Sequence, residues 1–293
     1  MKAVYQRELF SYFNSLSGYI FGAFLLLFAG IYCMVYNLRS AYVNFEFVLS
    51  GMCLIFMIIV PVLTMRVLAE ERRQKTDQLL YSLPLPMSKV VLGKYFAMLT
   101  IFALPMLIIC LYPVILAAYG NVNLITAFSA IIGFFLLGAA LIAIGMYVSS
   151  VTESQAVAAG LCFVVMLINY FLANLAGFVS STAFASFSAF IVLELVACLI
   201  IYWMTKNSFA AMVSAIVLCG GTMLLYGKNS AAFEGLFGDI LNELSLFERF
   251  YGFVDGIFDV TSIVYFIAVS AVFLFLSVQS MEKRRWSEGN CPS

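Results

Sequence analysis

The sequence predicts an all-α, polytopic membrane helix bundle, and three observations support this fold class. Hydrophobic residues make up 64% of the 293 residues and charged residues only 10%, against roughly 45–50% and about 25% in soluble domains. The mean hydropathy is +1.06. The apolar residues form uninterrupted runs of about 20, the length that crosses the hydrocarbon of a bilayer. Since a water-soluble core could not bury this much apolar surface, we expect a single transmembrane domain over residues 1–293.

Eight runs are long and apolar enough to be transmembrane helices. They lie at Gly18–Tyr36, Phe47–Met65, Phe96–Tyr119, Leu124–Val148, Ala156–Val179, Phe187–Met204, Phe209–Tyr226 and Val260–Val278. The breaks within residues 156–230 are short and only weakly polar, so six spans is the alternative count. The first run lacks the cleavage site of a signal peptide, and we expect it to remain in the protein.

The distribution of positive charge predicts the orientation in the membrane. With eight spans both termini share a side, and twelve of the 15 Lys and Arg residues fall on that side. The twelve are Lys2, Arg7, Arg66, Arg72, Arg73, Lys75, Lys89, Lys94, Lys206, Lys283, Arg284 and Arg285, and the other three are Arg39, Lys228 and Arg249. We therefore expect cytoplasmic termini and a location in the cell's cytoplasmic (inner) membrane.

Two segments outside the spans are amphipathic. Residues 1–16 place Tyr5, Leu9, Phe13 and Leu16 on one helical face, which predicts a helix in the membrane interface, with a simple extension of the first span as the alternative. Residues 231–250 carry a longer apolar stripe, which predicts an extracytoplasmic amphipathic helix on the membrane lipids; a substrate gate is the alternative. The stripe consists of Phe233, Leu236, Phe237, Ile240, Leu241, Leu244 and Phe247.

The loop between the second and third spans, residues 66–94, is the richest polar segment. It opens with Glu70, Glu71, Arg72 and Arg73, which suit a span that continues into water. Residues 77–83 then predict a short transverse helix, capped by Thr76 and ended by Pro84. From the residues alone this loop is either a docking element for a cytoplasmic partner or an ordinary solvated hairpin.

The sequence also excludes several functions. It contains no His and no C-x-x-C pair, which argues against a metal site or a Cys-His nucleophile. The lack of a basic run argues against nucleic acid, and no G-x-x-x-x-G-K-[ST] loop is present to bind ATP. Glu194 is the exception inside an apolar run: it either lines a substrate path or is a hydrogen-bonded carboxyl between helices. We therefore predict a transporter component without catalytic residues rather than an enzyme.

Four stretches in chain order carry a resemblance to a known family. They are RELFSYFNSLSGYIFGAFLLLF at Arg7–Phe28, LTMRVLAEERRQKTDQLL with VVLGKY in the first polar loop, GMYVSSVTESQAVAA at Gly145–Ala159, and LFERFYGFVDGIFDVTSIVYF at Leu246–Phe266. Together they resemble the ABC-2-type ABC transporter permeases, especially the branch of the gliding-motility and nitrous-oxide-reductase-maturation permeases. Two departures are Lys75, where the family usually has Gly, and residues 177–229, an added hairpin relative to six-span members.

This resemblance implies an exporter subunit that pairs with a second permease copy or a paralogue. Two cytoplasmic ABC ATPase subunits would bind ATP and Mg, and this chain would bind no cofactor itself. The ATPase-coupling contact would be Thr76–Leu83 with its flanking charges. Its residues are Glu70, Glu71, Arg72, Arg73, Thr76, Asp77, Leu79, Leu80, Tyr81 and Leu83. A secondary transporter driven by an ion gradient is the alternative, and the substrate is open.

Overall fold

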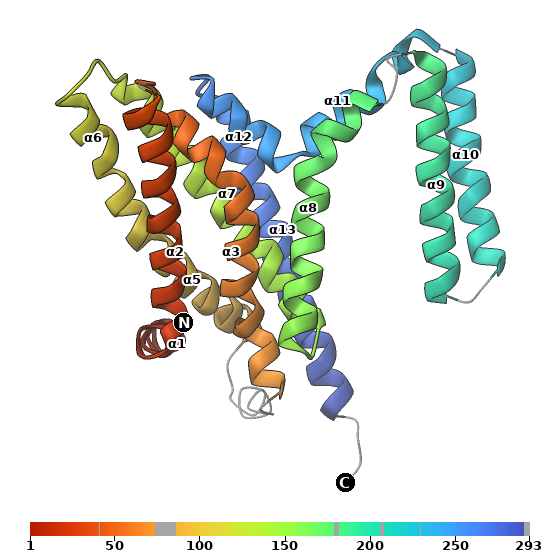
Figure 1. Cartoon of the computed structure of the whole chain (residues 1–293). Coiled ribbons are helices and arrows are strands. Elements are labelled where there is room, and N and C mark those ends of the chain that lie inside the picture. Colours follow the sequence, from red (N-terminus) through yellow and green to blue (C-terminus); the bar gives the residue numbers. More distant parts are fainter. Residues whose placement is uncertain (41, 74–85, 179–181, 206–207, 229, 290–293) are drawn as a thin grey trace. The chain divides into compact units, whose positions relative to one another are not determined.

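The computed structural model describes residues 1–40, 42–73, 86–178, 182–205, 208–228 and 230–289, and every regular element in these ranges is helical (Figure 1). The first half contains α1 (Lys2–Asn14), α2 (Leu16–Cys33), the π-helical turn η1 (Met34–Arg39), α3 (Glu46–Arg73), α5 (Met87–Ile109), α6 (Leu111–Ala117) and α7 (Leu124–Val151). The second half contains α8 (Gln155–Phe178), α9 (Ala183–Thr205), α10 (Ser208–Lys228), the 3-10 turn η2 (Ser230–Phe233), α11 (Leu236–Leu244), α12 (Leu246–Val254) and α13 (Val260–Gly289). The prediction of an all-α membrane bundle is confirmed.

Within the described residues, six helical segments are long and apolar enough to cross a membrane. They are Leu16–Arg39, Glu46–Ala69, Met87–Ala117, Leu124–Val151, Gln155–Phe178 and Val260–Arg284. The two remaining predicted spans also form helices, α9 and α10, of 23 and 21 residues. Their apolar stretches at Ala183–Val196 and Ser214–Gly227 are shorter, so the choice between eight and six spans stays a prediction.

The chain divides into two compact units. Unit 1 contains Met1–Leu167 and Arg249–Ser293, and unit 2 contains Ile168–Glu248. The boundaries fall inside α8 and α12.

The core of unit 1 forms around α7, which packs against α3, α5 and α13. Phe56 of α3 lies with its ring centroid 5.2 Å from that of Phe102 in α5 and 4.8 Å from that of Phe134 in α7. A side chain at Gly138 of α7 would overlap the Phe102 and Phe56 rings, so only glycine permits this approach. Small residues of this kind let membrane helices come close enough for dispersion contacts.

The last span of unit 1 begins at a defined cap. The Asp259 carboxylate accepts hydrogen bonds from the Thr261 N–H (2.9 Å), the Ser262 N–H (3.2 Å) and the Ser262 hydroxyl (3.0 Å). These donors hold the pKa of the Asp259 carboxyl below its usual value, because they stabilise its charged form. Asp259 thus fixes the residue at which α13 starts.

In unit 2, α9 and α10 form an antiparallel pair (Figure 1). The Phe187 and Tyr226 rings stack across the pair with centroids 4.4 Å apart, and Phe233 of η2 packs edge-on against both rings. The outward side chains are apolar and exposed, among them Val192 and Leu224. This surface suits lipid or protein rather than water.

The amphipathic helix predicted over residues 231–250 is shorter than predicted, and one continuous helix over this range is wrong. Gly235 adopts a left-handed backbone conformation (φ 71°), and Ser245 is extended, so α11 lies between two breaks. The Ser245 hydroxyl accepts a hydrogen bond from the Glu248 N–H at 3.2 Å, which caps α12. The S-x-x-E sequence at 245–248 is a helix-start signal that the apolar periodicity had hidden.

The N-terminal helix is confirmed as an element separate from the first span, because Ser15 between α1 and α2 is extended (φ −98°, ψ 149°). Phe13, on the face predicted to lie in the membrane interface, is exposed, as is Leu16 at the start of α2, whereas Val4 and Tyr12 of α1 are buried. Protein contacts therefore select one side of α1 and leave part of the predicted apolar face for the membrane interface.

Candidate coupling site

The N-terminal helix and three helix ends lie at the same end of unit 1 (Figure 1). They are α1, the C-terminal end of α3, the N-terminal end of α5 and the C-terminal end of α13. The predicted coupling loop joins α3 to α5, so its two bases lie at this end.

A buried lysine links three of them. The Lys94 side chain on α5 is 1% exposed, and its ammonium donates to the Glu8 carboxylate of α1 at 3.2 Å and to the Val67 carbonyl of α3 at 3.1 Å. A buried ammonium is stable only when it is paired and hydrogen-bonded. Lys94 therefore ties the N-terminal helix to both helices that carry the loop.

Further contacts hold α1 on the same two helices. The Tyr5 hydroxyl is 2.9 Å from the Thr100 hydroxyl of α5, and the Tyr12 hydroxyl donates to the Leu63 carbonyl of α3 at 3.4 Å. Val4 packs against Val90 and against the space left by Gly93. The whole length of α1 is thus bound to the bundle.

The ends of α3 and α13 are fastened to α7. The Ser149 hydroxyl oxygen of α7 accepts from the Ala69 N–H of α3 at 3.1 Å. The Arg284 guanidinium of α13 donates to the Val151 carbonyl at 2.9 Å and lies 3.5 Å from the Glu153 carboxylate. A displacement of α3 or α5 at this end would therefore reach α7 and α13 through direct contacts.

The structure places the predicted coupling residues in two groups. Glu70, Glu71, Arg72 and Arg73 belong by their backbone to the last turn of α3, which confirms that this helix continues past its apolar stretch. Thr76, Asp77, Leu79, Leu80, Tyr81 and Leu83 lie outside the described residues, so the transverse helix stays a prediction. The sequence analysis missed Lys94 as a site residue because charge counting assigned it to the surface.

Glu194 belongs to unit 2, whereas the contacts of Lys94, Ser149 and Arg284 belong to unit 1. It is half-buried on α9, and its carboxylate accepts a hydrogen bond from the Thr222 hydroxyl of α10 at 3.3 Å. The Cys219 thiol on α10 also contacts this carboxylate. The carboxyl between helices that we gave as an alternative is therefore present, and a role in a substrate path stays a prediction.

The fold defines a multi-pass integral membrane protein. Residues 34–286 match the family described as ABC-2 family transporter protein, and the chain belongs to this family. It is the membrane-spanning permease subunit of an exporter-type ABC transporter, a non-catalytic subunit that works with ABC ATPase subunits. Membership of this family sets aside the secondary-transporter alternative. A search of curated proteins gave no match.

The Lys94 link generates a first prediction. Lys94→Met removes the ammonium that holds Glu8 and the Val67 carbonyl, and we expect it to lower the free energy of unfolding by roughly 2–4 kcal/mol. Lys89→Met, an exposed lysine five residues earlier on α5, is the matched control and should be neutral. Unfolding of the detergent-solubilised protein, followed by denaturant titration, measures both. Equal stabilities for the two variants would contradict the structural role of Lys94.

Proposed function

We propose that α1 and residues 74–85 together receive the conformational change of the ATPase subunits and pass it to the spans. The observation that supports this is the Lys94 contact, since it joins α1 to α3 and α5, the two helices between which the loop is placed. A transverse helix at Thr76–Leu83 would seat in a cleft of one ATPase subunit. Asp77 would begin this helix, and Leu79, Leu80, Tyr81 and Leu83 would supply its contacts, with Glu70, Glu71, Arg72 and Arg73 beside them.

In this proposal the ATP and Mg are held by the partner subunits. Two ATPase subunits dimerise on ATP and move the paired coupling loops, and a second permease, either a copy of this chain or a paralogue, completes the transporter. Because α3 and α5 are bonded to α1 and α7, movement of the loop bases alters access between the spans. ATP hydrolysis resets the arrangement.

We also propose that this end of unit 1 is cytoplasmic. The N-terminal helix and the described C-terminal part of α13 lie at the same end of unit 1 (Figure 1), and the sequence-based topology assigns twelve of the 15 basic residues to the side of the termini. Positive charges remain preferentially on the cytoplasmic side of a membrane. By the sequence-based count of spans, α11 would lie on the outer surface.

The branch and cargo belong to the same proposal. The four stretches that resemble the gliding-motility and nitrous-oxide-reductase-maturation permeases favour that branch. The exposed side chains Ile240 and Leu244 on α11 suit contact with lipid. A lipid-like cargo, a peptide and force transmission to an extracytoplasmic partner are all compatible with this helix.

The proposed contact between the loop and the ATPase predicts that a charge at the centre of the loop weakens ATPase binding. Leu80→Asp should weaken ATPase binding roughly thirtyfold, because loss of one apolar contact at the centre of such an interface typically costs about 2 kcal/mol. Co-purification with the cognate ATPase and transport in proteoliposomes measure the effect. Ile125→Asp is the control, since Ile125 is 82% exposed at the start of α7, at the opposite end of the spans. Normal ATPase binding and transport by Leu80→Asp would contradict the proposed contact.

The proposed orientation predicts that residues 75 and 243 are labelled from opposite sides of the membrane. In a parent chain whose seven native cysteines are replaced by Ser or Ala, Lys75→Cys and Glu243→Cys should react with a membrane-impermeant maleimide from the cytoplasmic and outer sides respectively. Right-side-out and inside-out vesicles distinguish the two, and the cysteine-free parent chain gives the background. Labelling of both positions from one side would exclude the proposed topology.

For Glu194 we propose a role in the substrate path in addition to its hydrogen bond. Glu194→Gln keeps an oxygen that accepts from Thr222 but removes the charge, so stability should be retained while transport falls. Glu234→Gln, an exposed carboxyl in unit 2, is the control. Substrate-stimulated ATPase activity and transport are the measurements, and full activity of Glu194→Gln would leave the carboxyl a packing role only.

A further inference from the structure

The last buried turns of α3 are bonded through their backbone to side chains of three other helices. Tyr12 of α1 donates to the Leu63 carbonyl at 3.4 Å, and Lys94 of α5 donates to the Val67 carbonyl at 3.1 Å. Ser149 of α7 makes the third contact. A carbonyl in a helix ordinarily accepts from the N–H four residues further on, so these backbone groups are shared between α3 and its neighbours.

The Ser149 contact reaches both partners of one helical hydrogen bond. Its hydroxyl oxygen accepts from the Leu68 N–H at 3.3 Å and from the Ala69 N–H at 3.1 Å, and its hydroxyl donates to the Met65 carbonyl at 3.4 Å. The Ala69 N–H and the Met65 carbonyl are four residues apart, the spacing of one bond of the helix. Because a hydroxyl is both a donor and an acceptor, Ser149 can take the place of that bond when it lengthens. Both backbone groups then stay paired beside a side chain that has no exposed surface.

The turns of α3 just before this bridge are also weakened. Pro61 lies inside the helix and has no N–H, so the Met57 carbonyl has no donor four residues further on. The Thr64 hydroxyl donates to the Val60 carbonyl at 3.1 Å, an arrangement that often bends a helix. Sharp bends occur at prolines and where a side chain enters the hydrogen-bond ladder of a helix. Both causes are present in this part of α3.

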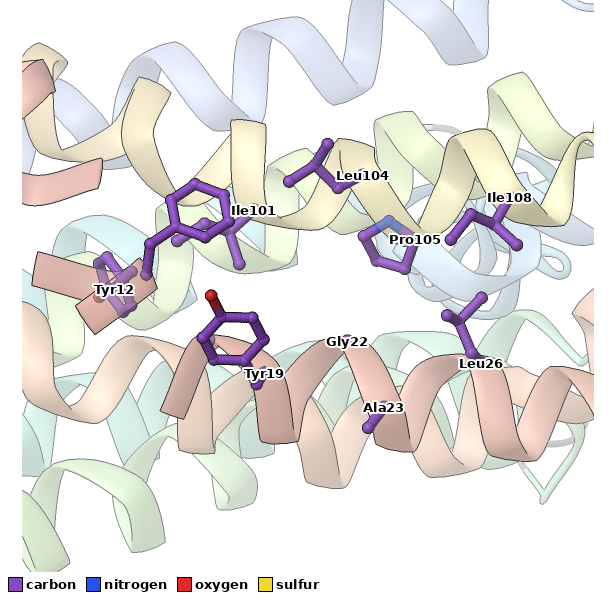
Figure 2. Close-up of a pocket in the computed structure, with 11 residues that line it drawn as sticks. Tyr12, Tyr19, Gly22, Ala23, Leu26, Ile101, Leu104, Pro105 and Ile108 are labelled. Atoms are coloured by element: carbon purple, nitrogen blue, oxygen red, sulfur yellow. The ribbon is translucent and has the colours of Figure 1, made fainter. Parts of the chain in front are cut away.

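Tyr12, the partner of the Leu63 carbonyl, borders open space. It lines an apolar pocket between α2 and α5, together with Tyr19 and Gly22 of α2 (Figure 2). A Cβ added at Gly22 would meet nothing within 4 Å. The pocket therefore leaves α1 room to follow a movement of α3.

We propose that the turn Met65–Ala69 is a hinge at which α3 bends when the ATPase subunits move the coupling loop. Ser149 is the positioning residue of this hinge, because its hydroxyl keeps the backbone of the turn paired in the straight and in the bent helix. The hinge depends on the proposed function, since the loop of residues 74–85 that follows α3 would transmit the movement of the ATPase. A bend of about 20° at the start of the turn moves residue 73, about 12 Å further along the helix, by roughly 4 Å.

Distances between spin labels test the hinge without a known substrate. In a chain whose seven native cysteines are replaced by Ser or Ala, labels are placed at Arg73→Cys, the last residue of α3, and at Lys283→Cys, which is exposed on α13. The complex with the cognate ATPase, diluted with unlabelled permease, is measured in nanodiscs by double electron–electron resonance, without nucleotide and with MgATP and vanadate. We expect nucleotide to shift the distance by up to about 4 Å, and Ser149→Ala, which has no hydroxyl to bridge the turn, to abolish the shift.

Ser149→Thr keeps a hydroxyl and should restore the shift. Ser277→Ala is the matched control, because Ser277 on α13 is also fully buried and its hydroxyl donates to the Phe273 carbonyl of its own helix at 2.8 Å; the shift should be unchanged. A distance that nucleotide does not alter in the ATPase-bound wild-type permease, or a full shift in Ser149→Ala, would overturn the hinge. Co-elution of the ATPase is recorded for every sample, and its failure with the wild-type chain would contradict the proposed function itself.

Discussion

The close approach of α7 to its neighbours is the contact on which unit 1 depends. In a bilayer the lipid tails are as apolar as leucine, so helices gain little from burying apolar surface and rely on close packing. Three glycines make this packing possible: Gly133 faces the ring of Phe253, Gly138 faces Phe102, and Gly145 faces Thr64. A methyl group at any of the three would meet those side chains closer than ordinary contact allows. The close packing of α7 therefore depends on the absence of a side chain at these three positions.

Composition and run length were sufficient to predict the fold class and a helix at each of the eight apolar runs, six of them long and apolar enough to cross a membrane, because the cost of unsatisfied backbone groups in hydrocarbon leaves helices as the default. The positions at which helices break were harder to predict from the sequence. The apolar stripe of residues 231–250 continues across Gly235 and Ser245, although the backbone leaves the helix at both. Periodicity measures which face is apolar and carries no information about a left-handed glycine or a capping serine.

The candidate site illustrates a second limit. Charge counting correctly treats most lysines as solvated, yet Lys94 is buried because Glu8 and the Val67 carbonyl reach it from other helices. Such a pairing depends on tertiary contacts between residues far apart in the sequence. The same contacts decide which face of α1 is buried, and for that reason Val4 and Tyr12 pack against protein. The loop residues around Leu80 were identified by resemblance, which needs no tertiary information.

The separation of Glu8 and Lys94 along the chain has a consequence for biosynthesis. The two residues are 86 positions apart, and at about 5–20 residues per second a ribosome needs roughly 4–17 s to reach the second after the first. During that interval α1 has emerged, while α5, which supplies its ion pair and much of its packing surface, has not yet been made. Until then the exposed side chains Phe10 and Phe13 of α1 can rest on lipid at the membrane surface. Docking of α1 is thus a late event in the assembly of this subunit, timed by the synthesis of its third span.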